Sequence, residues 1–190
     1  LVMRLVVISG HSGSGKTSAL NVLEDIGFTC IDNLPASLLR NLIAELRAQP
    51  LADEKKVAVG IDARNLVGDL ATIPEILREI EICGVDVSVI FMYARRTDLV
   101  RRFSETRRKH PLSSDSISLI GAIELEETLL APIASITDRK VDTTGLSLHQ
   151  LRDLIKNIIA PDNLEHMSIL FESFGFKRGL PEDADFIFDV

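Results

Sequence analysis

The sequence predicts an α/β fold in which helices cover both faces of a parallel sheet of about five strands, giving three layers. Segments typical of strands alternate with segments of helical periodicity along the chain, which is the pattern of a parallel sheet covered on both faces. The first strand, at residues 3–9, is a nearly continuous apolar run, as expected for a strand buried on both faces. Hydrophobic residues make up 46% of the chain, enough for a buried core.

The remaining elements follow in order. A helix is expected at residues 16–26, because Leu20, Leu23 and Ile26 share one side and Gly27 can end it. Further strands are expected at residues 28–32, 57–62, 87–93 and 141–143. Further helices are expected at residues 35–48, 73–83, 95–109, 116–131 and 147–159. Ser147 is a suitable N-cap for the last helix.

Residues 10–17, GHSGSGKT, match the P-loop pattern G-x-x-x-x-G-K-[ST] and lie between the first strand and the first helix. Glycines let backbone N–H groups surround a phosphate, and the start of a helix favours an anion at the same place. Lys16 can reach the outer phosphates, and Thr17 offers a hydroxyl to Mg²⁺. The motif predicts a P-loop NTPase fold that binds a nucleoside triphosphate, with Lys16 as a catalytic residue. The residues expected to contact the nucleotide are Gly10, His11, Ser12, Gly13, Ser14, Gly15, Lys16 and Thr17.

A P-loop enzyme also needs a carboxylate near the metal, usually at the end of a strand. Asp32, Asp62 and Asp142 all follow expected strands, whereas the strand at residues 87–93 ends without an acidic residue. We expect Asp32 and Asp62 to hold Mg²⁺ together with Thr17. The alternative for each aspartate is that it caps the turn after its strand.

Residues 62–65 combine a carboxylate, a guanidinium and an amide in the order Asp62, Ala63, Arg64 and Asn65. These groups suit a metal, a phosphate and a hydrogen-bonding ligand respectively. We therefore expect all four residues to contact the nucleotide, and Asp62 to act in catalysis as well.

A basic segment at residues 95–109 contains seven basic and two acidic residues, although the net charge of the chain is −7. It follows the fourth strand, where small-molecule P-loop kinases place a lid, and lid arginines can clamp phosphates. Arg107 and Arg108 are expected to contact the nucleotide in this way, with Arg101 and Arg102 in the same kinase-like lid. The same segment could bind an RNA backbone or form a solvated helix face.

The composition changes near residues 160–163, and strand-like aromatic segments follow. We expect a P-loop nucleotide-binding domain at residues 1–162 and the beginning of a truncated C-terminal domain at residues 163–190. No apolar run reaches the roughly 18 residues of a membrane span, and no signal peptide is evident. Cys30 and Cys83 form no metal-ligand or disulfide pattern. We expect a cytoplasmic protein that forms a homo-oligomer and does not bind a membrane.

Six segments together resemble the RapZ/YvcJ family of bacterial nucleotide-binding proteins, in the same order and over essentially all 190 residues. They are GHSGSGKTSAL, LEDIGFTCIDNLP, IDARN, LVRRFSETRRKHPLS, VDTTGLSLHQL and FESFGFKRGLPEDADFIFDV. The resemblance implies binding of ATP and GTP with slow hydrolysis, with the ATP segment at residues 10–17 and the guanine-nucleotide segment at residues 62–65. It also implies a C-terminal domain after Val190, which in the enterobacterial RNase adapter binds small RNAs and helps present them to an endoribonuclease. The chain departs from the family at Tyr93, where an acidic residue is usual.

Three functions fit these observations. The first is a regulatory NTPase that acts as an adapter for small RNA or a ribonuclease, and it is the function we favour. The second is a small-molecule kinase of the shikimate or gluconate kinase type, because residues 141–147, VDTTGLS, also occur before a helix in such folds. A kinase needs a base near the acceptor hydroxyl, and Asp32 could serve. The third is a nucleotide-binding module without turnover.

Overall fold

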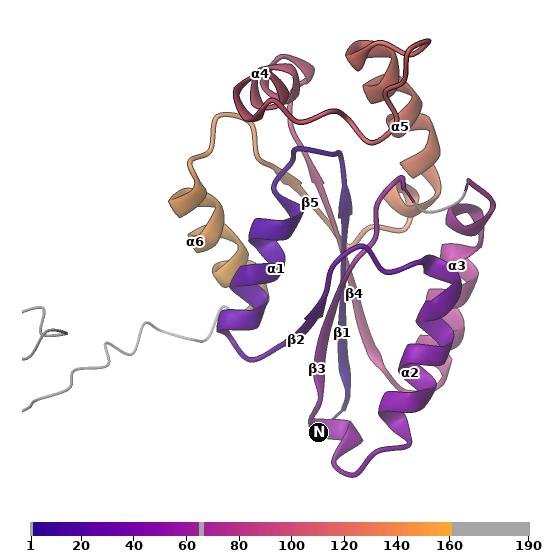
Figure 1. The fold of residues 1–190 in the computed structure, drawn as a ribbon. Coiled ribbons are helices and arrows are strands. Elements are labelled where there is room, and N and C mark those ends of the chain that lie inside the picture. Colours follow the sequence, from indigo (N-terminus) through magenta and orange to yellow (C-terminus); the bar gives the residue numbers. More distant parts are fainter. Residues whose placement is uncertain (1, 65–66, 161–190) are drawn as a thin grey trace, which may run out of the picture. The chain divides into compact units, whose positions relative to one another are not determined.

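The computed structural model describes residues 2–64 and 67–160, and its centre is a five-stranded parallel sheet in the order β2-β3-β1-β4-β5 (Figure 1). The strands are β1 (Arg4–Gly10), β2 (Thr29–Ile31), β3 (Lys56–Gly60), β4 (Asp86–Tyr93) and β5 (Arg139–Asp142). The helices are α1 (Lys16–Asp25), α2 (Leu39–Arg47), α3 (Val67–Ile82), α4 (Arg96–Thr106), α5 (Leu119–Ser135) and α6 (Leu148–Ile159). Two short 3₁₀ helices, η1 (Ala36–Leu38) and η2 (Ala52–Glu54), complete the order. The predicted three-layer α/β fold is confirmed.

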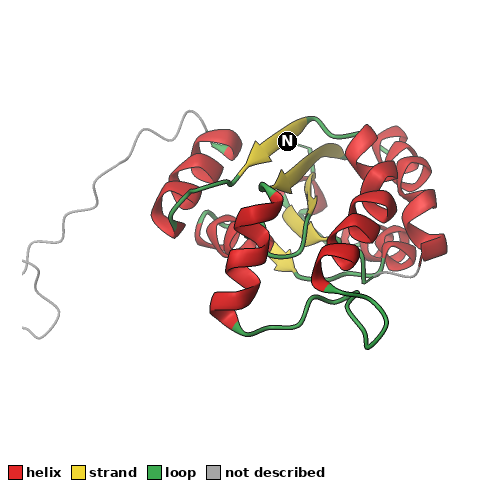
Figure 2. Cartoon of the chain, turned by 90° about the horizontal axis from the view of Figure 1, so that it is seen from above, coloured by secondary structure: helices red, strands yellow, loops and turns green. Residues whose placement is uncertain are grey.

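Helices lie on both faces of the sheet, as the view from above shows (Figure 2). Alternate residues of β1 face opposite layers because successive strand side chains point to opposite faces. Leu5 and Val7 pack with α2, α3 and α5, whereas Val6 and Ile8 pack with α1 and α6. All four side chains are fully buried, so β1 is the centre of two apolar cores.

The connections place the P-loop at the point where the strand order reverses. From β1 the chain crosses one face through α1, and from β3 it crosses the opposite face through α3. In open α/β sheets, ligands bind outside the carboxyl ends of the strands at such a point. The residues after β1 and after β3 are therefore neighbours at a place suited to a ligand.

Several element ends differ from the sequence-based expectation: α3 begins at Val67 rather than at residue 73, and α5 spans Leu119–Ser135 rather than residues 116–131. Two further differences affect the residues near the P-loop. Helix α4 stops at Thr106 because Arg107 takes a left-handed conformation, with φ of 53°, and closes the helix. Strand β3 ends at Gly60, so Asp62 lies in the loop beyond it. The predicted N-cap of α6 is confirmed, because Ser147 Oγ accepts from Gln150 N–H and Gln150 Oε1 accepts from Ser147 N–H.

Leu1–Ile159 forms one compact unit. The expected C-terminal segment at residues 163–190 lies outside the described residues, so the division into domains stays a prediction. Among the described residues, no helix combines the length and the apolar character needed to cross a membrane.

Candidate functional site

The P-loop leaves β1 through a backbone position that only glycine can occupy. Gly10 has φ of 134°, and a Cβ there would lie 1.9 Å from the carbonyl oxygen of Met92 on the adjacent strand. His11 N–H then donates to the same carbonyl at 3.0 Å, which holds the loop against β4. The first N–H groups of α1, which begins at Lys16, have no partner within the helix and face the loop. This arrangement is a cradle for an anion.

The Lys16 ammonium group lies inside the loop. Its Nζ donates to the carbonyl oxygens of Gly10 at 2.8 Å and of His11 at 3.1 Å. Burial lowers the pKa of Lys16, and the nearby carboxylates of Glu126, Asp62 and Asp32 oppose that shift. A bound polyphosphate would favour the charged form in the same way, so the position suits a lysine that contacts phosphate.

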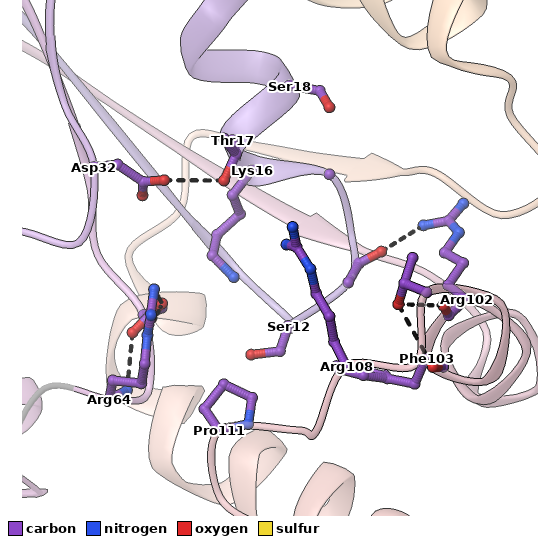
Figure 3. Close-up of a pocket in the computed structure, with 14 residues that line it drawn as sticks. Ser12, Lys16, Thr17, Ser18, Asp32, Arg64, Arg102, Phe103, Arg108 and Pro111 are labelled. Atoms are coloured by element: carbon purple, nitrogen blue, oxygen red, sulfur yellow. Dashed lines mark hydrogen bonds and ion pairs between the residues drawn. The ribbon is translucent and has the colours of Figure 1, made fainter.

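A cavity of about 460 Å³ opens over the loop (Figure 3). Its floor is the P-loop and the start of α1, from Ser12 to Ser18. One wall contains Asp32, Asp62 and Arg64, and the other contains residues of α4 and of the segment after it. The structure therefore brings together most residues that the sequence singled out. Gly10, His11 and Ser14 shape the loop but are not among the residues that line the cavity.

Asp32 and Thr17 form a pair at the start of α1. Thr17 Oγ1 donates to Asp32 Oδ2 at 2.9 Å. The absence of a side chain at Gly60 makes room for this aspartate, since a Cβ at Gly60 would lie 2.7 Å from Asp32 Oδ1. The pair places a hydroxyl and a carboxylate oxygen side by side on the cavity wall (Figure 3).

Asp62 holds Arg64 against the cavity. Arg64 donates its backbone N–H to Asp62 Oδ1 and its Nε to Oδ2, both at 2.9 Å, and Nη2 lies 2.7 Å from Oδ2. The Asp62 side chain is buried, whereas half of the Arg64 side chain is exposed. Ala63 between them is buried, and Asn65 lies outside the described residues. The carboxylate thus directs a guanidinium into the cavity, which suits recognition of an anion.

The arginines of the basic segment divide into two groups. Arg102 and Arg108 line the cavity, whereas Arg101 and Arg107 do not. Arg101 pairs with Asp98 at 2.9 Å on the surface of α4. Arg102 donates to Gly13 O at 2.8 Å, and also to the hydroxyl and carbonyl oxygens of Thr143. Arg108 extends toward the P-loop from the segment after α4 (Figure 3).

Asp142 caps a turn. Its Oδ1 accepts the N–H of Thr144 at 2.9 Å, and hydrogen bonds from Thr144 lower the pKa of this carboxyl. It does not line the cavity. This is the turn-capping role given above as the alternative for each aspartate.

Glu126 also contacts the P-loop, although the motif analysis did not select it. Its fully buried carboxylate accepts from Ser12 Oγ at 2.6 Å and Ser12 N–H at 2.9 Å, and it lies 3.2 Å from His110 Nε2. Burial would raise the pKa of Glu126, but the hydrogen bonds from His110 and Ser12 outweigh it and lower the pKa below its usual value. Glu126 therefore lies under the loop as an ionised carboxylate.

The fold and the loop geometry define a P-loop protein of the α/β class. A profile described as the RapZ-like N-terminal domain matches residues 3–163, and the chain belongs to this family.

Similar proteins include relatives of known sequence and solved structures. A protein of Saccharophagus degradans and one of Pseudomonas aeruginosa, both named nucleotide-binding protein, are each 52% identical over 188 residues, or 99% of this chain. The chain spans 65% and 66% of the length of these two relatives.

Two solved kinases share the fold. Shikimate kinase from Acinetobacter baumannii has a TM-score of 0.52 and 14% identity, covering 86% of this chain and 96% of the kinase. A sugar kinase from Janibacter has a TM-score of 0.51 and 20% identity, covering 84% and 96% respectively. At these identities the likeness concerns the fold alone.

Proposed function

We propose that this chain binds a nucleoside triphosphate, ATP or GTP, over the P-loop and hydrolyses it slowly. The observation that supports this most strongly is the convergence of Lys16, Arg64 and Arg108 on one cavity whose floor is the P-loop. A polyphosphate is the common small ligand that matches several cations together with a cradle of N–H groups. The relatives' name, nucleotide-binding protein, agrees with this ligand class.

Mg²⁺ fits the residues present. The paired oxygens of Thr17 and Asp32 are hard donors at the start of α1, beside the phosphate cradle. Within residues 2–64 and 67–160, no group of three or more His, Cys, Asp or Glu side chains forms a separate metal site. Two protein oxygens are what Mg²⁺ needs when phosphates and waters supply the rest. When bound, the ion would neutralise charge on the phosphates.

Asp62 acts in this proposal through Arg64. Both of its oxygens accept hydrogen bonds from that residue, and it directs the guanidinium to the place where outer phosphates would lie. A guanidinium there stabilises charge that develops on the transferred phosphoryl group. Direct coordination of Mg²⁺ by Asp62 is the alternative.

The experiment compares Asp62→Asn with Arg64→Ala. Phosphate release and nucleotide dissociation constants would be measured for both variants, with melting temperatures as a control for folding. If Asp62 acts by holding Arg64, the two variants slow hydrolysis to a similar extent. A much larger loss in Asp62→Asn would favour metal coordination. If the native protein neither binds nucleotide nor releases phosphate above the blank, the proposed function is wrong.

We further propose that nucleotide occupancy regulates an adapter. The relatives are longer than this chain by about a third of their length, so contacts with small RNA or a ribonuclease would depend on that remaining part. The expected homo-oligomer stays a prediction. Binding of the family's longer proteins to RNA, with and without nucleotide, would test the regulatory role.

A small-molecule kinase is the second candidate, because Asp32 and Arg64 line the same wall of the cavity. A carboxylate could accept a hydroxyl proton while a guanidinium binds an anionic group of the acceptor. Shikimate and gluconate would be added to an ATPase assay with product analysis. Phosphorylated acceptor would support a kinase, and unchanged phosphate release would support the NTPase.

A further inference from the structure

Three buried polar groups form a link beneath the P-loop. Ser12 belongs to the loop, His110 to the segment after α4, and Glu126 to α5. The side chains of His110 and Glu126 are both 0% exposed. Glu126 accepts two hydrogen bonds from Ser12, at 2.6 and 2.9 Å, and lies 3.2 Å from His110 Nε2. Because the side chains of His110 and Glu126 are shielded from solvent, losing one of their hydrogen-bond partners leaves a buried polar group unsatisfied.

The hydrogen bonds define the tautomer of His110. Leu112 N–H donates to His110 Nδ1 at 3.2 Å, so Nδ1 must offer its lone pair. The proton is then on Nε2, and Nε2 donates to Glu126 Oε2. The Glu126 carboxylate is consequently the acceptor of three hydrogen bonds, two from the P-loop and one from the segment after α4.

His110 is also the anchor of the segment that contains Arg108. Helix α4 ends at Thr106, and the chain after it lacks helical hydrogen bonds. Ser113 donates its N–H to His110 O at 3.0 Å and its hydroxyl to the same oxygen at 2.7 Å. Arg108, two residues before His110, and Pro111, directly after it, both line the cavity.

A second contact joins the same parts. The rings of His110 and Phe103 lie 5.1 Å apart between centroids. Phe103 in turn packs on the loop, since a Cβ at Gly13 would lie 3.3 Å from its ring. The imidazole of His110 is therefore connected to the loop by the hydrogen bonds of Glu126 and by its contact with the Phe103 ring. The backbone of the same residue holds the segment that contains Arg108.

We propose that His110 and Glu126 are positioning residues that connect the P-loop to the Arg108 segment, so that Arg108 contributes to triphosphate binding only while this link is intact. The inference rests on the proposed function, and it adds a coupling between two parts of that site. In this proposal Arg108 contacts phosphate from one wall of the cavity, as Arg64 does from the other, and His110 determines where Arg108 lies.

Two substitutions of His110 separate its two nitrogens. The Asn amide oxygen in His110→Asn can replace Nδ1 as acceptor for Leu112 N–H, but no donor reaches Glu126. The Gln amide nitrogen in His110→Gln can replace Nε2 as donor to Glu126, but the Leu112 acceptor is lost. Each variant would be made alone and with Arg108→Ala. Dissociation constants for Mg²⁺–ATP and Mg²⁺–GTP would be measured by calorimetry, together with melting temperatures.

The expected result is that the effect of Arg108→Ala on triphosphate affinity depends on which residue occupies position 110. Arg108→Ala should weaken triphosphate binding about tenfold in the native and His110→Gln backgrounds. In the His110→Asn background, the same change should alter affinity less than about twofold, because Arg108 is already misplaced. A tenfold effect of Arg108→Ala in every background would overturn the proposal. So would equal loss of coupling in both His110 variants, since that would indicate ring packing alone.

Two further measurements test the same link between the P-loop and the Arg108 segment. If His110→Asn does not fold, Ser12→Ala removes only the 2.6 Å hydroxyl bond to Glu126, and the effect of Arg108→Ala should then shrink. An unchanged effect there contradicts the link. Hydrogen exchange without nucleotide should be faster at residues 107–109, which include Arg108, in His110→Asn than in His110→Gln. If the native protein binds no triphosphate, the proposed function fails, whereas binding without coupling refutes only the link.

Discussion

Gly10 is the residue at which β1 becomes the P-loop, and its backbone lies against the Met92 carbonyl. A Cβ at 1.9 Å from that oxygen can only be accommodated by separating β1 from β4, and φ of 134° is unfavourable for any side chain. We predict that Gly10→Ala lowers the free energy of unfolding by at least about 3 kcal/mol. Denaturant unfolding followed by circular dichroism would measure it.

Gly27→Ala is the matched control. Gly27 also has a positive φ, 89°, but a Cβ there would meet nothing within 4 Å. Only backbone strain applies, so the loss should be about 1 kcal/mol. Equal losses in the two variants would show that the contact with Met92 is unimportant.

Glu126 should make the free energy of unfolding depend on pH in the acidic range. Its folded pKa lies below the ordinary value of 4.5, so its contribution is fully present above about pH 4.5 and is lost as pH falls through the folded pKa. We predict that Glu126→Gln lowers unfolding free energy by about 2 kcal/mol at pH 7, with a smaller difference from the native protein below pH 4.5. Urea unfolding between pH 3 and pH 7 would measure both.

Glu124→Gln supplies the comparison, because the Glu124 side chain is 55% exposed and pairs with Arg96 on the surface. It should change stability by no more than about 0.5 kcal/mol at pH 7. If Glu126→Gln behaves like Glu124→Gln, the buried bonds to Ser12 and His110 do not stabilise the fold.

The sequence did contain a signal for Glu126 that motif analysis did not use. Ile123, Glu126, Leu130 and Ile133 follow the spacing of one helix face, and all four are fully buried. An acidic residue within an apolar stripe indicates a buried partner. The identity of that partner could not be predicted, because Ser12 is 114 residues away and only tertiary packing brings it close.

The end of helix α4 decides which basic residues reach the cavity. The sequence predicted a basic helix at residues 95–109 that stops near Pro111. The left-handed conformation of Arg107 ends it at Thr106 and turns the following residues over the P-loop. A single residue outside the helical region thus separates the role of Arg107 from that of Arg108.

We predict that Arg108→Ala weakens triphosphate binding about tenfold, whereas Arg107→Ala changes it less than about twofold. Arg108 lines the cavity, and its neighbour does not. Calorimetric titration of each variant would measure the difference. In the native protein, hydrogen exchange across residues 95–115 should slow when Mg²⁺ and a non-hydrolysable triphosphate are added.

RNA binding by the basic segment gives a different pattern. Both substitutions would then weaken RNA affinity to a similar extent, and the slope of affinity against salt would fall with each charge removed. Equal effects on triphosphate affinity would contradict the role assigned to Arg108.

Local sequence patterns were sufficient to predict the fold of the molecule. Apolar runs located the strands, helical spacing located the helices, and their alternation implied a parallel sheet with two covered faces. The P-loop and the aspartates after β2 and β3 were also identifiable, because strand ends meet at one edge of such a sheet. Contacts between segments far apart in the sequence could not be identified in this way. Arg102, for example, donates hydrogen bonds to Gly13 and Thr143, which are 89 and 41 residues away.

The central claim is that residues 10–17 bind a nucleoside triphosphate, and titration of Lys16→Ala with Mg²⁺–ATP and Mg²⁺–GTP tests it most directly. The substitution removes the cation that lies against the Gly10 and His11 carbonyls and leaves the N–H cradle in place. We predict at least about a tenfold loss of affinity, or about 1.4 kcal/mol, with little change in melting temperature. An unchanged dissociation constant in a folded variant would contradict it.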